Sequence, residues 1–411
     1  MIYFYKILGL ILIPIIKIHI KRRIKKGKEI SNRYKERFGI SNASKNSSNK
    51  IIWIHAASVG EFKSATYLIN LLSQKYTILI TTTTVSAANY ATEHYKNKII
   101  HQFAPLDISF WVNNFLNKWN PSLIIWIESD LWPITLHIIK KRKINSILLN
   151  LRMSPKSYKL WKVFSKFYTK GIECFDEIYA QSKLDQSRII SLTKKNIKFI
   201  GNLKFASLDL NNNTFNVENY KNNTFVNIIF VSTHKNEEIQ FLPIIKKLIN
   251  KFPKTKYFIA PRHPERAEEI IRICNNLNLS TTLENIKQSS NKNITIINSF
   301  GKLSKYYKLN DIVFLGGSIT NNGGHNPIEP AMYKCAILSG KNVFNWQNIY
   351  EDMELEKSCI KIETTNELEI ELNNLIINDT KIKIMKDNAY KYAKKQFFDK
   401  ALLETIIEKY I

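Results

Sequence analysis

Short apolar runs alternate with longer segments of helical periodicity from about residue 50 onward. In the first half the runs are rich in isoleucine and aromatic residues and end in polar or small residues, which predicts strands at Ile51–Ala57, Thr77–Thr82, Ile99–Phe103, Leu123–Ile127, Ile144–Leu149, Glu177–Ala180 and Ile197–Ile200. The spacing between them predicts helices at Lys63–Leu72 and Ser86–Tyr95. Strands that alternate with helices indicate parallel βαβ units.

A polar, asparagine-rich segment at residues 209–224 interrupts this alternation and is interpreted as an interdomain linker or surface loop. Strands are predicted again at Val226–Val231, Tyr257–Ala260, Ile294–Ile297, Ile312–Leu315 and Ala336–Leu338. Helices are predicted at Asn236–Lys251, Pro264–Leu277, Asn326–Tyr333 and in the tail Lys381–Ile411. The pattern therefore predicts an α/β protein with two doubly wound, Rossmann-like domains, at residues 29–208 and 225–390.

The first 28 residues differ from the rest of the chain. The first 20 are apolar apart from Lys6, Lys17 and His19, and a basic cluster follows at residues 21–28. The apolar run is shorter than the ~20 residues of a comfortable membrane span, and no small-residue cleavage site follows it. We interpret residues 1–28 as a membrane anchor, either a short signal anchor or a helix in the interface, with the basic cluster on the cytoplasmic side against anionic lipid. A buried first helix is the alternative.

The composition supports two domains and an anionic partner. The 411 residues are 44% apolar, enough for two cores, and the formal net charge of +27 indicates nucleic acid, an acidic membrane or a phosphorylated substrate. Part of the lysine excess fits the codon bias of an AT-rich genome. The four cysteines lack the spacing of a zinc site or a disulfide framework. No Walker A, HExxH or GxSxG motif is present, and the GxGxxG of a dehydrogenase is missing after the first strand.

The segment GGSITNNGGHNPIEP, residues 316–330, follows a predicted strand. Its last part looks like a helix start, with Asn326 at the N-cap, Pro327 at the first helical position and Glu329 at the third. A strand, a glycine-rich loop and a helix N-terminus together present backbone N–H groups to an anion. The alternative is a tight turn followed by a well-capped helix.

Other strand ends in the first half supply acidic residues. Glu61 falls at a helix N-terminus, where the helix dipole is expected to lower its pKa and keep it ionised, as a general base requires. Ser58 and Glu61 also have capping-box spacing, and Gly60 would let a ligand approach closely. Glu128 and Asp130 follow another strand and suit a polar pocket, although we prefer a helix cap for Asp130.

Basic residues lie at further strand ends. Arg152 could pair with a phosphate or carboxylate, or be a solvated surface charge. Arg262 is held between Pro261 and a predicted helix start, which suits a phosphate ester. His234 and His263 occupy equivalent strand ends and could add donors.

Nine segments recur in the order and spacing of one enzyme family: WIHAASVGE (53–61), ESDLWP (128–133), NLRMS (150–154), AQS (180–182), GNLKF (201–205), STHKNEE (232–238), APRHPER (260–266), GGSITNNGGHNPIEP (316–330) and FNWQNI (344–349). Over nearly its whole length the chain resembles the 3-deoxy-D-manno-octulosonic acid (Kdo) transferases of lipopolysaccharide assembly. The resemblance implies a GT-B fold, in which two Rossmann-like domains face each other across a cleft and a C-terminal helix, here residues 391–411, crosses back to the first domain.

The resemblance also implies an inverting, metal-independent transfer of Kdo from CMP-Kdo to the lipid A precursor (lipid IVA), without a cofactor, at the cytoplasmic face of the inner membrane. Glu61 matches the catalytic base and Glu128 a second acidic residue. The matching CMP contacts are Pro261, Arg262, Phe300, Gly301, Lys302, Asn326, Pro327, Ile328 and Glu329. Candidate phosphate or acceptor contacts are Ser58, Gly60, Arg152, Lys204, His234 and His263.

This sequence departs from the family pattern in two places. Lys302 replaces the usual acidic residue, so only its backbone role carries over, and Lys341-Asn342 replaces a frequent Pro-His. Two rivals remain: another GT-B enzyme, such as a UDP-sugar lipid glycosyltransferase or a nucleotide-sugar epimerase, and a basic peripheral membrane-binding protein. A nucleic-acid partner is not expected, because such modules usually place aromatic residues on a basic face. The sequence fixes neither the number of Kdo residues added nor the oligomeric state.

Overall fold

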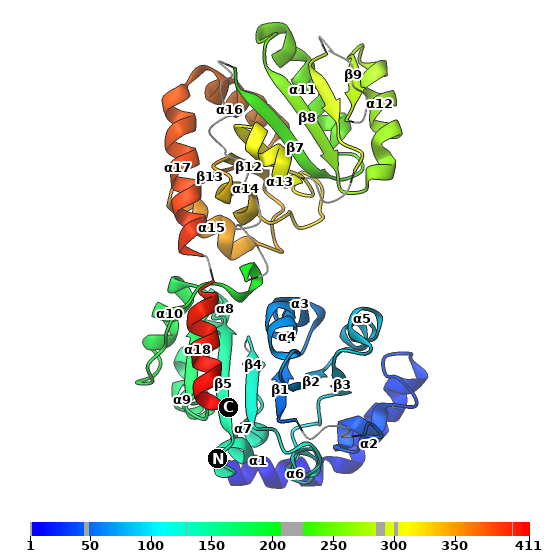
Figure 1. The fold of residues 1–411 in the computed structure, drawn as a ribbon, viewed down its shortest axis with the longest axis vertical. Coiled ribbons are helices and arrows are strands. Elements are labelled where there is room, and N and C mark those ends of the chain that lie inside the picture. Colours follow the sequence, from blue (N-terminus) through cyan, green and yellow to red (C-terminus); the bar gives the residue numbers. More distant parts are fainter. Residues whose placement is uncertain are drawn as a thin grey trace. The chain divides into compact units, whose positions relative to one another are not determined.

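The computed structural model describes residues 2–44, 49–128, 130–206, 225–284, 292–299, 303–396 and 398–411. The predicted linker at 209–224 and the predicted CMP contacts Phe300, Gly301 and Lys302 lie outside the described residues. The chain divides into two compact units, one of Met1–Asp209 with Phe397–Ile411 and one of Leu210–Gln396. Each unit is built around one parallel sheet flanked by helices (Figure 1), which confirms the predicted α/β class with two doubly wound domains.

The sheet of the first unit has six parallel strands in the order β3-β2-β1-β4-β5-β6, the strand order of a Rossmann fold. The strands are β1 (Ile51–His55), β2 (Thr77–Thr82), β3 (Ile100–Phe103), β4 (Leu123–Ile127), β5 (Asn145–Leu151) and β6 (Glu177–Ala180). The helices that follow them are α3 (Val59–Ser64), α4 (Thr66–Leu72), α5 (Val85–Tyr95), α6 (Ser109–Trp119), α7 (Pro133–Lys141), α8 (Pro155–Val163), α9 (Ser165–Ile172) and α10 (Lys183–Ile190).

Both faces of this sheet are buried. Successive side chains of a strand point to opposite faces, so Ile52 and Ile54 of β1 enter one hydrophobic cluster while Ile51 and Trp53 enter the other. Helices α3, α4 and α5 cover the first cluster, and α6, α7 and α9 cover the second. Burial on both faces explains why these strands read as continuous apolar runs in the sequence.

Two predictions for the first unit were wrong in detail. Residues 197–200 form no strand, because Lys198 makes a single bridge to Tyr179 and the ladder goes no further. The helix predicted at Lys63–Leu72 is two helices that begin earlier, since Ser58 caps α3 by accepting a hydrogen bond from Glu61 N–H.

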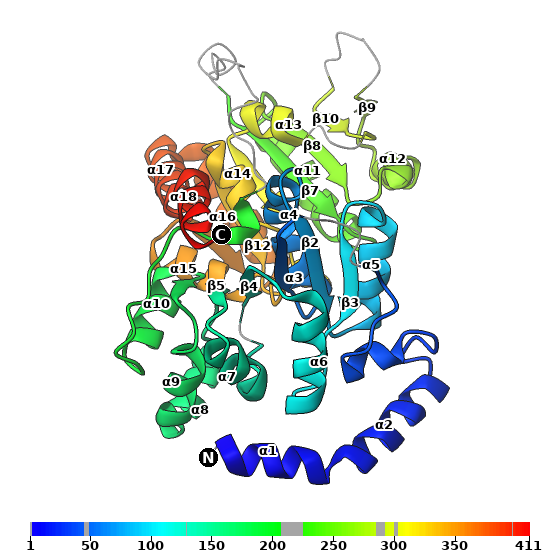
Figure 2. The ribbon, with the colours of Figure 1, turned by 60° about the horizontal axis from the view of Figure 1, so that its bottom comes forward.

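The N-terminal residues form two helices, α1 (Ile2–Ile11) and α2 (Ile13–Lys25), at the border of the first unit (Figures 1 and 2). Pro14 lies in the first turn of α2, where its missing N–H is tolerated, and the helix is interrupted at Leu12. None of the helices in the described part of the chain is long and apolar enough to cross a membrane.

The second unit has a seven-stranded parallel sheet in the order β13-β12-β11-β7-β8-β10-β9. Its strands are β7 (Asn227–Thr233), β8 (Lys256–Pro261), β9 (Thr281–Leu283), β10 (Ile294–Ile296), β11 (Ile312–Leu315), β12 (Ala336–Gly340) and β13 (Cys359–Ile362). Its helices are α11 (Glu238–Lys251), α12 (Ala267–Asn276), α13 (Leu303–Leu309), α14 (Ile328–Met332), α15 (Gln347–Leu355), α16 (Thr365–Ile377) and α17 (Asp379–Lys395).

The helix predicted at Asn326–Tyr333 is shorter than expected. Its hydrogen-bonded residues begin at Ile328, and Pro327 just before them already has helical backbone angles. The Asn326 side chain accepts a hydrogen bond from Ile328 N–H at 3.0 Å, which is the capping contact predicted for it.

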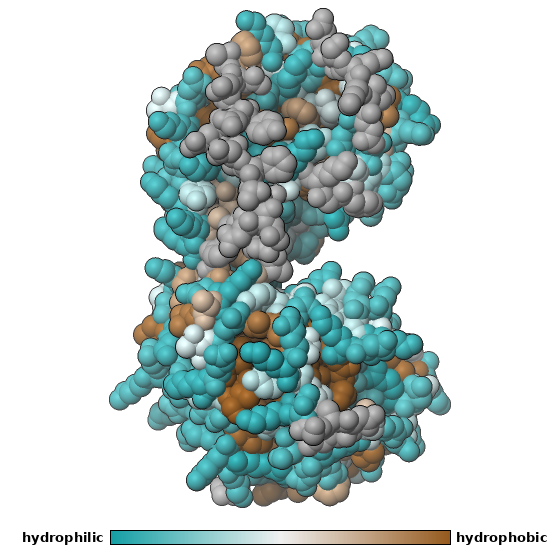
Figure 3. All heavy atoms as spheres, in the orientation of Figure 1, coloured by the Kyte–Doolittle hydropathy of each residue, from teal (hydrophilic) through white to brown (hydrophobic). Residues whose placement is uncertain are grey.

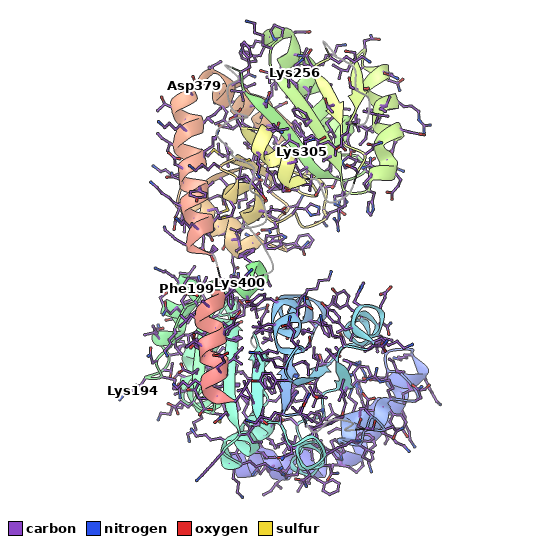
Figure 4. All side chains as sticks on the ribbon, viewed as in Figure 1. Lys194, Phe199, Lys256, Lys305, Asp379 and Lys400 are labelled. Atoms are coloured by element: carbon purple, nitrogen blue, oxygen red, sulfur yellow. The ribbon has the colours of Figure 1, made fainter. Side chains whose placement is uncertain are left out.

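The last helix, α18 (Lys400–Tyr410), packs in the first unit. It adds Leu403, Ile406 and Ile407 to the hydrophobic cluster that contains Ile52 and Ile54 of β1. Asp399 N–H donates to Ile200 O at 2.8 Å, and Figure 4 shows the labelled residues Phe199 and Lys400 next to each other. The predicted helical tail is therefore split between α17 in the second unit and α18 in the first.

Candidate active site

Glu61 lies in the first turn of α3, immediately after the carboxyl end of β1. Its Oε2 accepts a hydrogen bond from Ala57 N–H at 2.7 Å, and its Oε1 accepts one from the Ser58 hydroxyl at 3.0 Å. Ser58 Oγ in turn accepts from Glu61 N–H at 3.3 Å. The capping role weighed in the sequence is thus confirmed, and it also fixes the direction of the carboxylate.

The expected pKa of Glu61 was wrong in sign. Burial and the negative charge of Glu128 raise the pKa of Glu61 to about 7, although the Ala57 and Ser58 hydrogen bonds act in the opposite direction. α3 has only six residues, so its dipole is small beside these two effects. A carboxylate with a pKa near neutrality can both accept and release a proton at physiological pH.

Glu128 is held at the end of β4 by a polar cluster. Its Oε1 lies 3.3 Å from Lys204 Nζ and accepts a hydrogen bond from the Asn150 amide at 3.4 Å. The side-chain oxygen of Asn150, Oδ1, accepts a hydrogen bond from Leu203 N–H at 3.1 Å and so links the cluster to the segment that carries Lys204. Glu128 and Asn150 both have positive φ, of 62° and 60°. Left-handed backbone at two non-glycine residues is costly and often marks a functional site.

Asp130 does not cap a helix, so that interpretation was wrong. Its Oδ2 lies 3.4 Å from Nε2 of the buried His55. Burial alone would raise the pKa of Asp130, but the hydrogen bond and the charge of His55 lower it. Asp107 caps α7 instead, because it accepts hydrogen bonds from Ile134 N–H and Thr135 N–H at 3.0 and 2.7 Å.

The Glu61–Glu128 coupling gives a first testable prediction. Glu128→Gln should lower the pKa of Glu61 from about 7 part of the way toward its ordinary value, because it removes the charge that raises this pKa most after burial and leaves Lys204 without that partner. NMR titration of the Glu61 side-chain carboxyl carbon measures this. Asp130→Asn is the matched control and should lower the pKa less, since Asp130 has a smaller effect on Glu61. An unchanged Glu61 pKa in Glu128→Gln would contradict the coupling.

Two other candidates of the first unit, Gly60 and Arg152, are exposed. A Cβ placed on Gly60 would meet nothing nearer than Ser58 Oγ at 3.8 Å, so packing within the chain does not require a glycine. Burial raises the pKa of Asp185 and the charge of Arg152 opposes this effect, so Arg152 lies near Asp185.

An apolar cavity of about 570 Å³ lies between the N-terminal helices and the loops that follow β2, β3 and β4. Its lining includes Leu8, Leu12 and Ile16 on one side and Ile108 and Trp132 on the other. Hydrophobic side chains also reach the surface along the edge of the first unit where Figure 1 places α1 (Figure 3). Those most exposed on the two helices are Ile7, Leu10, Ile11, Ile15 and Ile18.

A buried ion-pair group holds the end of α2 beside this cavity. Glu29 pairs with Arg23 at 3.0 Å and with Arg37 at 3.3 Å, and Arg37 also donates to Thr83 O at 2.6 Å. Arg23 is therefore engaged within the protein, whereas Lys21, Arg22 and Lys25 are exposed.

The second unit collects basic side chains at its strand ends. Arg262 follows β8, its N–H donates to Thr233 O at 3.0 Å, and its side chain is exposed. His234 lies close enough to Arg262 and His263 for their charges to act on it, although burial is the largest cause of its lowered pKa. Nε2 of His234 lies 3.1 Å from Nε2 of His325. Burial, followed by the charges of His234 and Arg262, lowers the pKa of His325 to about 4.

The glycine-rich loop does present converging backbone N–H groups, but a side chain of the same unit occupies them. The buried carboxylate of Glu237 accepts hydrogen bonds from the N–H groups of Gly317, Ser318, Ile319 and Thr320. Glu329, in the first turn of α14, is partly buried, and burial raises its pKa.

Reasoning from the sequence missed His325, Glu237 and Asn150. Each lies in or beside a motif that had been singled out, but only the fold shows which partner each one contacts. A signal was present for Glu237 and Glu238, since two adjacent acidic residues close to a buried strand end require partners.

Comparison with known proteins identifies the family. The model of the family described as 3-deoxy-D-manno-octulosonic-acid transferase (kdotransferase) matches residues 32–207. The 3-deoxy-D-manno-octulosonic acid transferase of Rickettsia bellii is 33% identical over 402 residues, which cover 95% of each chain. The enzyme of that name from Haemophilus influenzae is 29% identical, over 88% of this chain and 87% of its own.

The fold also has solved counterparts. The UDP-GlcNAc 2-epimerase of Neisseria meningitidis aligns with 87% of this chain and 100% of its own at a TM-score of 0.51 and 12% identity. At that identity the likeness shows the fold alone, which is the GT-B arrangement of two Rossmann-like domains. The identity to the Rickettsia protein, which extends across both units, settles the family. The chain belongs to the 3-deoxy-D-manno-octulosonic-acid (Kdo) transferases, a family of glycosyltransferases.

Proposed function

We propose that this protein transfers Kdo from CMP-Kdo to a lipid A precursor by an inverting displacement that needs no metal ion. The observation that carries the proposal is the Glu61 carboxylate, fixed by two hydrogen bonds and with a pKa of about 7. The proposal assigns the acceptor and the base to the first unit and the nucleotide to the second.

Glu61 acts as the general base. Its carboxylate takes the proton of the acceptor hydroxyl while that oxygen forms a bond to the anomeric carbon of Kdo. The bond from this carbon to the CMP phosphate breaks on the opposite side, so the configuration inverts in one step. CMP leaves with the electron pair, and Glu61 returns its proton to solvent. A pKa near neutrality lets Glu61 act in both directions.

The Glu128–Lys204 pair sets the charge around this step. Glu128 keeps the proton affinity of Glu61 high, and Lys204 offers a cation beside negative charge that develops as the sugar is transferred. Asn150 bonds both to Glu128 and to the backbone before Lys204 and therefore fixes the distance between them. These contacts favour a reaction centre over a simple helix cap.

The nucleotide is assigned to the second unit. Arg262 presents an exposed guanidinium at the end of β8, which suits the phosphate of a nucleotide. Glu329 is partly buried in the first turn of α14, and its carboxyl group can form hydrogen bonds with the ribose hydroxyls. Phe300, Gly301 and Lys302 remain predicted contacts from the family resemblance.

A lipid acceptor fits the N-terminal helices. The apolar cavity behind α1 and α2 can take part of an acyl chain, and the exposed lysines and arginines at the end of α2 can contact anionic head groups. We place the protein at the cytoplasmic face of the inner membrane on this basis.

The direct test is to incubate the purified protein with CMP-Kdo and lipid IVA and to determine the product masses. Addition of one or more Kdo residues, with release of CMP, is the expected result. A panel of UDP-sugars is the control for another glycosyltransferase. Turnover of a UDP-sugar without turnover of CMP-Kdo would overturn the proposal, and the number of Kdo residues added would be read from the same spectra.

Charge reversal at the end of α2 tests the membrane role. Lys21→Glu, Arg22→Glu and Lys25→Glu together should lower activity on acceptor in anionic vesicles more than on acceptor in detergent, because each lysine or arginine near an anionic surface contributes about 1 kcal/mol. Arg23 is left unchanged, since it pairs with Glu29. Equal losses of activity in vesicles and in detergent would contradict this role.

A further inference from the structure

The carboxylate of Glu237 is fully buried and surrounded by backbone donors. Its Oε2 accepts from Gly317 N–H at 2.7 Å and from His234 N–H at 2.9 Å. Its Oε1 accepts from the N–H groups of Ser318, Ile319 and Thr320 at 3.0, 2.9 and 3.3 Å. Five backbone donors thus converge on one side chain with no exposed area.

These N–H groups form a nest, which is a concave anion-binding site of the backbone, and the Glu237 carboxylate is the anion that occupies it. Successive backbone N–H groups around a positive-φ residue, here Gly317 at φ +65°, form the concave sites that often bind phosphate. Among the described residues no lysine or arginine forms an ion pair with Glu237, so backbone dipoles compensate most of its charge. A buried charge is stable only when such partners are present.

The same five bonds determine where the two histidines lie. One bond fixes the backbone of His234, and the others fix the start of the loop that leads to His325. Gly324 N–H closes this loop on Gly317 O at 2.9 Å. A Cβ on Gly317 would lie 3.2 Å from ring atoms of both histidines. The 3.1 Å contact between the imidazoles therefore depends on the position of the loop.

We infer that Glu237 is a positioning residue of the donor site, which shapes the glycine-rich loop by filling its nest and so sets His234 and His325 beside Arg262. The inference rests on the proposed function, because it concerns binding of CMP-Kdo. It also means that the N–H groups of residues 317–320 are not available to the donor phosphate, so side chains such as Arg262 bind that phosphate instead.

Glu237→Gln tests the role, because it preserves the shape of the side chain but replaces one acceptor oxygen with an NH2 group that faces N–H donors. The KM for CMP-Kdo should rise about 30-fold, the size of effect expected when a charge-assisted hydrogen bond is lost, and a fixed concentration of CMP should raise the melting temperature less than in the wild-type protein. The KM for the lipid acceptor should stay within about threefold of the wild-type value, since the first unit is unchanged.

Asp185→Asn is the matched control. Asp185 is also a buried carboxylate that accepts a backbone hydrogen bond, from Met153 N–H at 2.7 Å, but it lies in the first unit. This variant should unfold at a lower temperature and keep its KM for CMP-Kdo. A purely structural Glu237 would behave in the same way, so an unchanged KM for CMP-Kdo in folded Glu237→Gln would overturn the inference.

The wild-type protein provides a second test that does not depend on a variant that folds. The amide proton resonances of residues 317–320 should move little when CMP is added, because Glu237 keeps its hydrogen bonds. Large downfield shifts of these four amides, as new bonds to phosphate would cause, would overturn the inference. If the wild-type enzyme does not turn over CMP-Kdo at all, the proposed function fails instead, so the two failures are distinguishable.

Discussion

Glu61→Gln should reduce Kdo transfer by about 100-fold to 10 000-fold, the usual contribution of a general base. The glutamine keeps the size of the side chain and can still accept the Ala57 hydrogen bond, but it cannot take a proton from the acceptor hydroxyl. The loss should fall on kcat, and CMP binding should stay unchanged, because the nucleotide is assigned to the other unit. Steady-state kinetics and calorimetric titration with CMP measure these quantities.

The same substitution should stabilise the fold at alkaline pH. The pKa of Glu61 is about 7 in the folded protein, against an ordinary value of 4.5, so the folded state retains a proton that the unfolded state releases. The free energy of unfolding of the wild-type protein therefore falls as the pH rises from 4.5 through about 7. The difference corresponds to about 3 kcal/mol at most, and we expect a gain of about 1–3 kcal/mol for Glu61→Gln at pH 8.5, since the side chain is partly exposed.

Urea unfolding at two pH values checks this result. The gain should be present at pH 8.5 and should disappear below pH 4.5, where the carboxyl is protonated in both states. Glu93→Gln, on the exposed surface of α5, is the control and should change neither stability nor transfer. If Glu61→Gln loses stability at both pH values while transfer stays near the wild-type rate, Glu61 is a helix cap and not the base.

The sequence was sufficient to locate the central strands of both sheets. Strands buried on both faces, such as Leu123–Ile127 and Ile312–Leu315, read as unbroken apolar runs, and their bounds were predicted without error. Strands at the edge of the second sheet were missed. Thr281–Leu283 is only partly buried and mostly polar, and Cys359–Ile362 is interrupted by a lysine, so neither gives a periodic signal of its own.

The sequence predicted where the acidic residues of the site lie, but not how their surroundings change their pKa values. The rule that functional loops follow the carboxyl ends of parallel strands brought Glu61 and Glu128 into one neighbourhood, as the structure has them, whereas the contact of Lys204 with Glu128 was not predicted. The pKa of Glu61 had the wrong predicted sign, because burial and the approach of Glu128 arise from segments far apart in the sequence. Local capping rules failed for Asp130 for the same reason, since Asp107, from the preceding strand end, takes the N–H groups of α7.

The adjacent acidic residues Glu237 and Glu238 show this limit most clearly. Both side chains are fully buried, yet one bonds to the backbone of the glycine-rich loop and the other to Arg266. No local pattern distinguishes them, because their partners come from the loop after β11 and from the turn after β8. Each pairing nevertheless has a consequence that a single substitution can expose.

Arg266→Met should destabilise the protein by about 3–5 kcal/mol, the usual cost of leaving a buried charge unpaired. Arg266 donates to both oxygens of Glu238 at 2.9 and 3.0 Å, and Glu238 has no exposed area. Among the described residues, its other hydrogen-bond partner is the Thr233 hydroxyl at 2.7 Å, which cannot balance a full charge. Urea unfolding at pH 7 measures the change, with tryptophan fluorescence and circular dichroism as independent probes.

Arg272→Met is the matched control, because Arg272 is an exposed arginine on α12 whose side chain donates a long, 3.4 Å hydrogen bond to Glu268 O. Its effect should stay within about 0.5 kcal/mol. Adding Glu238→Gln to Arg266→Met removes the unpaired charge and should recover part of the loss. If Arg266→Met alone costs no more than the control, the pair contributes little to stability. The turn at residues 261–266, which presents Arg262, would then owe its position to Pro261 and Pro264 and not to this ion pair.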